Sequence, residues 1–301
     1  MELMGDRTCS VHLSHNTEFT NLVLQSSFSN IMSLSKIKSI LGGNPLVVEV
    51  ASGEWQRARQ MIEENGNLVR KWSVAPSLTG GVAASNILPI HQACKMDDVS
   101  VQFVEALLWA YPESIRKRET GFRRVALHIA IRARVSNDVI FYLIDKYPEA
   151  VATQDVLGRV PLHYAISNHS PMEIINTLIS SCPATSRAAD NLGWTPLHVA
   201  ANCSRSAEMV ETLIQCGSES VVSTTTKGNT PLMVAMMSTG PDRELIKTIL
   251  VEEEQKFEKT AYFRNYREAE NNARAHPPYQ SSERMWGVRK LKRSSSFRLV
   301  V

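Results

Sequence analysis

The stretch DNLGWTPLHVAAN, residues 190–202, decides the fold because the chain repeats it. Similar stretches occur at five other places: GGNPLVVEVASGEW (42–55), NILPIHQACK (86–95), ETGFRRVALHIAIR (119–132), DVLGRVPLHYAIS (155–167) and TKGNTPLMVAMM (226–237). One leucine or isoleucine is shared by all six copies: Leu46, Ile90, Leu127, Leu162, Leu197 and Leu232. Its last three steps are 35 residues each, a period typical of stacked repeats.

Each copy predicts a helix, and a second helix is predicted after it. Pro196 suits the first helical turn, where its missing N–H needs no partner, and Thr195 is a good N-cap. Apolar triplets at helical spacing mark the second helix: Val104/Leu107/Leu108, Ile140/Leu143/Ile144, Ile175/Leu178/Ile179, Val210/Leu213/Ile214 and Ile246/Ile249/Leu250. Such a helix pair is too small to bury its own apolar face and must stack on its neighbours. The sequence predicts an all-α solenoid of about six helix-pair repeats.

The T-P-L-H core at 195–198 resembles that of the ankyrin repeats, and the resemblance covers residues 44–255. It implies hairpin-like tips and a structural role for four histidines that hydrogen-bond backbone between adjacent units: His91, His128, His163 and His198. Histidines 35 or 37 residues apart could instead form a metal or catalytic row, but no carboxylate or cysteine recurs beside them to complete a site. Val47 and Met233 replace the histidine in the end copies, which must face water on one side.

The predicted hairpin tips supply the candidate binding residues. A glycine that recurs in them is expected to have a positive φ: Gly121, Gly158, Gly193 and Gly228. The resemblance implies that the residues beside these glycines line a concave protein-binding face: Phe122, Arg123, Arg124, Arg159, Trp194, Lys227 and Asn229. A tryptophan among arginines is typical of a binding hot spot, and the arginines favour an acidic partner segment. The alternative for Trp194 is packing on the neighbouring hairpin.

Two insertions interrupt the period. The step from the first to the second copy is 44 residues, and its excess is predicted in the loop 72–85. The step from the second to the third is 37. Gly121 precedes Leu127 by six residues, whereas the other tips have four, so both extra residues are predicted in the third tip. This enlarged tip, with Arg123 and Arg124, is expected to project from the stack.

Composition favours a soluble intracellular chain. Of 301 residues, 43% are hydrophobic and 21% charged, which is ordinary for a globular protein. No secretory signal or membrane span is expected, and five cysteines without metal-ligand spacing fit reduced thiols in the cytoplasm, with the nucleus as an added location. No catalytic or phosphate-binding fingerprint is present, so we expect no enzyme activity, cofactor, metal or small-molecule substrate.

The chain is predicted to have four segments. A polar, serine-rich segment (1–40), either disordered or carrying a short amphipathic helix, precedes the repeat domain (41–255), a charged helical extension (256–275) and a basic disordered tail (276–301). The tail has a net charge of +5, against −2 for the rest. Its basic cluster adjoins three candidate phosphorylation sites that resemble basophilic kinase sites: Ser294, Ser295 and Ser296. The cluster also resembles a nuclear import signal, and Trp286 and Leu299 have a spacing similar to one calmodulin target.

These features favour a scaffold or adaptor that binds one or more proteins through the concave face of the stack. The alternative is a regulatory subunit whose basic tail is a docking or localisation element controlled by phosphorylation or calmodulin. We expect no nucleic-acid partner, and membrane contact only through the tail.

Overall fold

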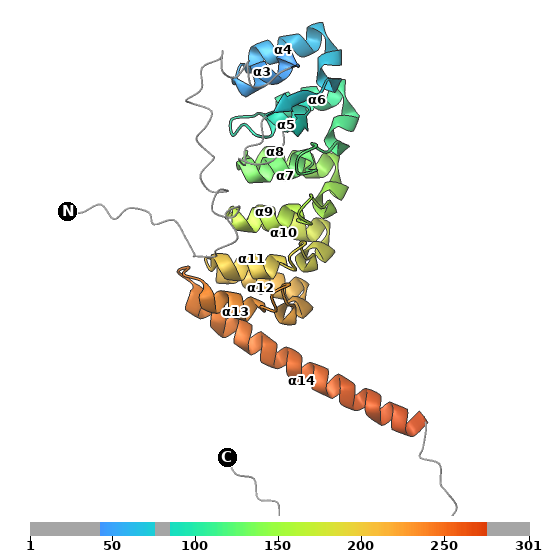
Figure 1. Ribbon diagram of the computed structural model, residues 1–301, viewed down its shortest axis with the longest axis vertical. Coiled ribbons are helices and arrows are strands. Elements are labelled where there is room, and N and C mark those ends of the chain that lie inside the picture. Colours follow the sequence, from blue (N-terminus) through green and yellow to red (C-terminus); the bar gives the residue numbers. More distant parts are fainter. Residues whose placement is uncertain (1–42, 76–84, 276–301) are drawn as a thin grey trace, which may run out of the picture. The chain divides into compact units, whose positions relative to one another are not determined.

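The computed structural model describes residues 43–75 and 85–275 of the chain. Six helix pairs follow one another and stack in chain order (Figure 1). The first helices are α3 (Pro45–Ala51), α5 (Pro89–Ala93), α7 (Ala126–Ala133), α9 (Pro161–Ser167), α11 (Pro196–Cys203) and α13 (Pro231–Met237). The second helices are α4 (Trp55–Glu64), α6 (Val101–Ala110), α8 (Asn137–Lys146), α10 (Met172–Ser181), α12 (Ala207–Cys216) and the start of α14 (Arg243–Ala275). The predicted helical solenoid is confirmed.

The first helices begin as their sequences predict. Pro196 occupies the first turn of α11, and the Thr195 hydroxyl accepts a hydrogen bond of 3.5 Å from the N–H of His198. Asn44 caps α3 in the same manner, accepting from the N–H of Leu46 at 3.1 Å. These side chains satisfy backbone donors that the first helical turn leaves without a partner.

A short 3-10 helix follows the second helix of each of the first five repeats: η1 (Gly66–Arg70), η2 (Pro112–Arg116), η3 (Pro148–Ala152), η4 (Pro183–Arg187) and η5 (Ser218–Val222). In η2, η3 and η4 a proline opens this turn. Proline disfavours the helical conformation for the residue before it, and at that residue the α-helix ends. The second helices end at these turns with or without a proline, and the chain then runs towards the next tip.

A small β-ribbon occupies the insertion between the first two repeats. Strands β1 (Ser73–Ala75) and β2 (Ser85–Ile87) pair antiparallel, with Ser73 opposite Ile87. Ala75 and Ile87 pack with Val47 and Val48 of α3 in a separate apolar cluster. The ribbon lies at the two ends of the predicted loop and is an addition to the expected all-α pattern.

One apolar core runs through the repeats. The shared leucine or isoleucine is almost completely buried in the first five repeats and partly buried, as Leu232, in the last. The apolar triplets of the second helices line the same core, and Ile246 and Leu250 at the start of α14 complete it. Each repeat thus buries its apolar face against the next one, which is why no single repeat needs a core of its own.

The chain divides into two units, Met1–Phe257 and Glu258–Val301. Helix α14 is continuous across residue 255, where the sequence predicts the repeat domain to end and the charged helical extension to begin. The predicted serine-rich segment 1–40 and the tail 276–301, with Ser294, Ser295 and Ser296, lie outside the described residues. Among the helices of residues 43–75 and 85–275, none combines the length and apolar character that a membrane span requires.

Candidate functional site

The four repeated histidines connect successive repeats. Each ring is buried, and its Nε2 lies within hydrogen-bond distance of a backbone carbonyl of the next repeat. For His128, His163 and His198 this carbonyl lies in the tip, whereas His91 reaches Lys117, the residue that follows η2. The distances are 2.9 Å for His91 to Lys117, 3.2 Å for His128 to Arg159, 2.9 Å for His163 to Trp194 and 3.0 Å for His198 to Asn229. The inter-repeat hydrogen bonds that the sequence analysis expects of these histidines are therefore present.

The hydrogen bond made by the second ring nitrogen, Nδ1, determines the tautomer of the histidine. Nδ1 accepts a backbone N–H from Leu88, Val160 and Thr195 for His91, His163 and His198 respectively, so Nε2 carries the proton and donates it to the carbonyl. Burial lowers the pKa of all four histidines, to about 4 for His91 and His128. All four rings are neutral at pH 7. In His91, His163 and His198 both ring nitrogens make hydrogen bonds. Within the described residues, no group of three or more His, Cys, Asp or Glu side chains could hold a metal ion.

An oxygen-bearing side chain closes each tip from inside. Asp190 accepts backbone N–H groups from Leu192 and Trp194, both at 2.9 Å. The equivalent groups are Glu119, which accepts from Gly121 and Phe122 at 2.8 Å, Asp155, which accepts from Leu157 and Arg159 at 2.8 and 3.0 Å, and Thr225, which accepts from Asn229 at 3.2 Å. These bonds fix the tip backbone without help from a partner.

Backbone hydrogen bonds also join each tip to the one before it. The N–H of Asn191 donates to Leu157 at 2.9 Å, and that of Thr226 donates to Leu192 at the same distance. Two further links are Val156 to Phe122 at 2.8 Å and Thr120 to Asn86 at 3.2 Å. The tips form a continuous ladder along one edge of the stack. We call residues 120–123, 156–158, 191–193 and 226–228 the tip edge.

The third tip departs from the sequence prediction. Gly158, Gly193 and Gly228 have positive φ values of 77°, 76° and 78°, but Gly121 does not, and Arg123 takes the left-handed conformation with φ 56°. Counted back from the shared leucine, Arg123 occupies the glycine position of the other tips. The identification of Gly121 as the equivalent glycine is therefore wrong.

The location of the two extra residues is also corrected. The bond that closes the third tip joins Glu119 to Arg124, one residue more than the bond from Asp155 to Arg159. Only one extra residue thus lies in the tip. The other lies earlier, because Leu107 follows the shared Ile90 by 17 residues, whereas the next three repeats have 16.

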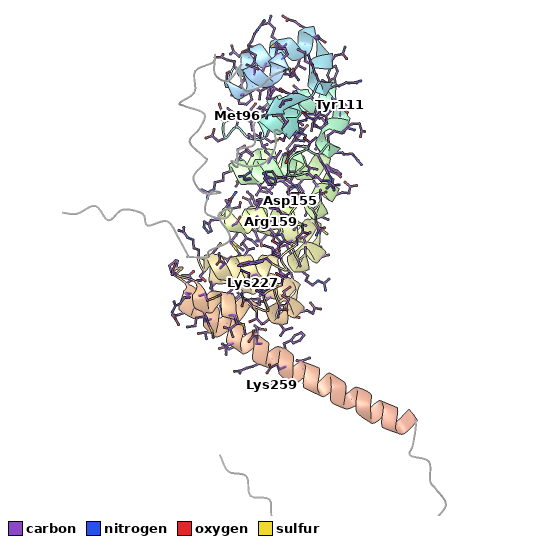
Figure 2. All side chains as sticks on the ribbon, viewed as in Figure 1. Met96, Tyr111, Asp155, Arg159, Lys227 and Lys259 are labelled. Atoms are coloured by element: carbon purple, nitrogen blue, oxygen red, sulfur yellow. The ribbon has the colours of Figure 1, made fainter. Side chains whose placement is uncertain are left out.

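Two of the predicted binding residues are buried inside the stack. Arg124 and Arg159 are 6% and 5% exposed. The Nε of Arg159 donates to Asp190 of the next tip at 3.3 Å, and that of Arg124 lies 4.0 Å from carboxylate oxygens of Glu119 and Asp155. Figure 2 shows Asp155 and Arg159 within the stack. The prediction that Arg124 and Arg159 lie on an exposed binding face is wrong, because each side chain is buried against the acids that close the tips.

The other predicted residues divide into two groups. Arg123 and Lys227 are exposed, whereas Phe122, Trp194 and Asn229 are half-buried. The guanidinium carbon of Arg124 lies over the Phe122 ring, 4.0 Å from the centroid of that ring. Trp194 packs against the core, with its ring centroid 6.0 Å from that of His198. Trp194 thus packs on the core and on His198 of its own repeat, and packing on the neighbouring hairpin stays a prediction.

The tip edge also carries apolar residues that sequence reasoning missed. Val156 and Leu192 are 46% and 45% exposed. Their signal in the sequence is their place, one or two residues before the left-handed glycine, where no core contact is needed. Two exposed apolar side chains, Val156 and Leu192, therefore lie between the exposed cations Arg123 and Lys227 along one fixed edge.

Two cations on the first helices were also missed. Lys95 and Arg132 each stand five residues after the shared isoleucine or leucine, in the second and third repeats. Both are half-exposed, and burial lowers their pKa values to about 8 and about 10. That repeat position is the only signal that the sequence offered for them.

The comparison with known families agrees with this architecture. The family model described as ankyrin repeats in three copies matches residues 90–187 and 170–261, which together make up more than half of the chain. No curated protein matches the sequence. With its stacked helix pairs, its tips and its inter-repeat histidines, the chain belongs to the ankyrin repeat family.

Proposed function

We propose that this chain is a scaffold or adaptor that binds a partner protein through the concave face of its stack, with the tip edge as the main contact. Ankyrin repeats are generally protein-interaction modules, and the tip edge supplies a surface of suitable chemistry. The observation that carries the proposal is the exposure of Val156, Leu192, Arg123 and Lys227 on a backbone already fixed by hydrogen bonds. A preformed surface loses little conformational entropy on binding.

Substitutions on the tip edge test this function. Immobilised full-length chain would capture partners from a cell extract, and the captured set would be quantified by mass spectrometry for the wild type and for the double variant Val156→Ser with Leu192→Ser. Both side chains are exposed, so the helical circular dichroism should not change. We expect the specific set to decrease at least fivefold.

A matched control is available on the second helices. Trp109 in α6 is 87% exposed, and Trp109→Ser removes a larger apolar side chain away from the tips. We expect this variant to capture the wild-type set. Unchanged capture by the tip variant, with loss in Trp109→Ser, would place the binding surface on the second helices and overturn the proposal.

The second candidate function concerns the basic tail. It is supported by the +5 charge of residues 276–301 and by the serines beside its basic cluster. Each phosphate at Ser294, Ser295 or Ser296 adds about −1.5 to −2 charge, so two would nearly cancel the tail's charge. In this proposal the tail directs an intracellular protein between nucleus, membrane surface and cytoplasm, under the control of phosphorylation or a calmodulin-like sensor.

The tail proposal is tested by localisation in cells. Replacing the three serines by aspartate should move the protein towards the cytoplasm, whereas alanine should not. Deleting 276–301 should leave capture by the repeats intact. Identical distribution of the aspartate and alanine forms would contradict a phosphorylation switch.

A further inference from the structure

We propose that the second and third repeats bind carboxylates of an acidic, Asp- or Glu-rich peptide segment between Lys95 and Arg132, beside the buried Arg124. The inference rests on the proposed protein-binding function and specifies the chemistry of the partner. Lys95 lies two residues after the end of α5 and Arg132 lies in the last turn of α7, and these two helices stack on each other. The two cations occupy the same position of adjacent repeats, and Arg132 is close enough to help lower the pKa of Lys95.

Lys95 and Arg132 have unused hydrogen-bonding capacity. In the part of the chain that the structure describes, neither side chain makes a hydrogen bond or an ion pair, although both are half-buried. The equivalent residues in the following repeats are Ser167, Asn202 and Met237, so the charge is confined to this end of the stack. A buried or half-buried cation without a counter-ion is unfavourable, and a partner's carboxylate would supply one.

The acids nearby are already occupied. Glu119 accepts two backbone N–H groups of its own tip. Asp155 accepts two backbone N–H groups and the hydroxyl of Tyr164, the last at 2.6 Å. Lys95, Arg124 and Arg132 face these two carboxylates, and the nearby Arg159 is paired with Asp190, so one positive charge is left over.

Arg124 is the buried member of these three cations. Its Nε is buried without a hydrogen-bond partner, and the side chain is 8% exposed. The guanidinium lies over the rings of Phe122 and Tyr164, 4.0 and 5.8 Å from their centroids, which holds it in place. Arg124 is therefore a fixed cation whose charge is not fully balanced by the carboxylates 4.0 Å away.

Burial and the neighbouring positive charges also affect the protonation of Lys95. Burial is the main cause that lowers its pKa to about 8, Glu119 opposes the shift, and the positive charges of Arg124 and Arg132 add to it. An incoming carboxylate favours the charged ammonium, so binding should draw a proton onto Lys95 near this pH. Acidic peptides should consequently bind more tightly at pH 7 than at pH 9.

The direct test is binding of a fluorescein-labelled decaglutamate peptide, followed by fluorescence anisotropy in low salt. The full chain would carry glutamine at Arg289, Lys290, Lys292 and Arg293, so that the basic tail does not bind the probe. We expect Lys95→Met with Arg132→Met to weaken binding at least tenfold and to abolish the difference between pH 7 and pH 9. Methionine keeps most of the aliphatic length, so the fold should survive, as circular dichroism would verify.

The control removes two other cations and so makes the same change in net charge. Lys146 ends α8 and Arg187 ends η4, and both side chains are about half exposed. Met96, the neighbour of Lys95, and Tyr111 lie on opposite sides of the stack (Figure 2). Lys146 precedes Tyr147, which is the equivalent of Tyr111 in the next repeat. Lys146→Met with Arg187→Met should weaken the peptide by less than twofold. An equal loss in both double variants would mean general attraction by net charge and would overturn the proposal, as would no loss in either.

Failure here is distinct from failure of the proposed function. The peptide assay reports on Lys95 and Arg132 alone, whereas capture with the Val156 and Leu192 variant reports on the tip edge. Loss of capture in the tip variant, together with peptide binding that ignores Lys95→Met and Arg132→Met, would retain a protein-binding edge and reject the carboxylate site.

Discussion

Interior and terminal repeats solve the same stacking problem with different residues at one position. In the fourth repeat His163 is buried and donates to the tip of the fifth. In the last repeat Met233 stands there, 49% exposed, since no further tip offers a carbonyl. In the first repeat Val47 is fully buried against the β-ribbon residues Ala75 and Ile87. The neighbour that stacks next therefore decides whether a hydrogen-bonding ring, an exposed thioether or an aliphatic side chain fits.

The left-handed glycines show the same contrast. A Cβ on Gly158 would lie 2.8 Å from the backbone N of Asn191, and one on Gly193 would lie 3.0 Å from the backbone of Thr225. A Cβ on Gly228 would meet nothing within 4 Å. All three glycines have the same left-handed backbone conformation. They differ in whether a following tip packs against them, and Gly228 has none.

Acid should have the largest effect, because it acts on all the histidine interfaces at once. The histidine pKa is about 6.5 in the unfolded chain and about 4 in the folded chain for His91 and His128. Between these values the unfolded chain binds more protons, so the stability present above pH 6.5 is lost as the pH falls towards 4. Each of the two histidines should contribute about 1.4 kcal/mol per pH unit in this window. Urea unfolding at pH 7, 6 and 5 would measure the slope.

The control for acid is His91→Gln, which removes one titrating group. Its slope should be smaller than that of the wild type by about 1.4 kcal/mol per pH unit. Equal stability of the wild type at pH 7 and pH 5 would contradict the assignment of neutral, proton-donating rings.

Alanine at the tip glycines should have the next largest effect. Gly158→Ala combines the strain of a left-handed alanine, about 1–2 kcal/mol, with overpacking against Asn191, about 1–3 kcal/mol. Gly228→Ala suffers the strain alone and should lose only about 1–2 kcal/mol. Urea unfolding of both variants at pH 7 gives the comparison. Equal losses would mean that the following tip does not constrain the glycine.

Removal of one inter-repeat histidine should have a smaller effect. His163→Ala leaves the Trp194 carbonyl and the Val160 N–H without their partner, at a cost of about 1–3 kcal/mol. His128→Ala should cost less, because the wild-type Nδ1 of His128 already lacks a hydrogen bond. Thermal melts with and without a chelator would check both variants, and the chelator should change nothing. A melt of His163→Ala that matches the wild type would contradict the role of the ring.

The fold could be predicted because its signals are local and periodic. The shared leucine, the proline and the histidine recur at nearly constant spacing, and each is dictated by contacts that recur too. The fate of Arg159 could not be predicted, since its partner Asp190 lies 31 residues away and only the stacking brings them together. The prediction that Gly121 has a positive φ was wrong for a related reason. The extra tip residue moves the left-handed position to Arg123, which a search for repeated glycines does not detect. The strands of the β-ribbon have three residues each, too few to show an alternation.

The smallest effect concerns a position at which interior and terminal interfaces should not differ. Ser114 in η2 and Ser220 in η5 occupy the same place in the 3-10 turn, and both hydroxyls are buried without a hydrogen-bond partner. η3 carries Ala150 there, buried to 1% exposure, so the site accepts a methyl group. Ser114→Ala and Ser220→Ala should each be neutral or stabilising by up to about 1 kcal/mol, because a buried hydroxyl without a partner is removed. Thr185→Ala is the control at the same place in η4: its hydroxyl donates to Cys182 at 2.7 Å, so its loss should destabilise. Urea unfolding would compare the stability of the three alanine variants. If Ser114→Ala destabilises the chain as much as Thr185→Ala does, the serine hydroxyl has a partner in solution. A gain at Ser114 without one at Ser220 would instead mean that the turn before the last repeat is less tightly packed than the interior ones, and would extend the contrast between the two kinds of repeat to their 3-10 turns.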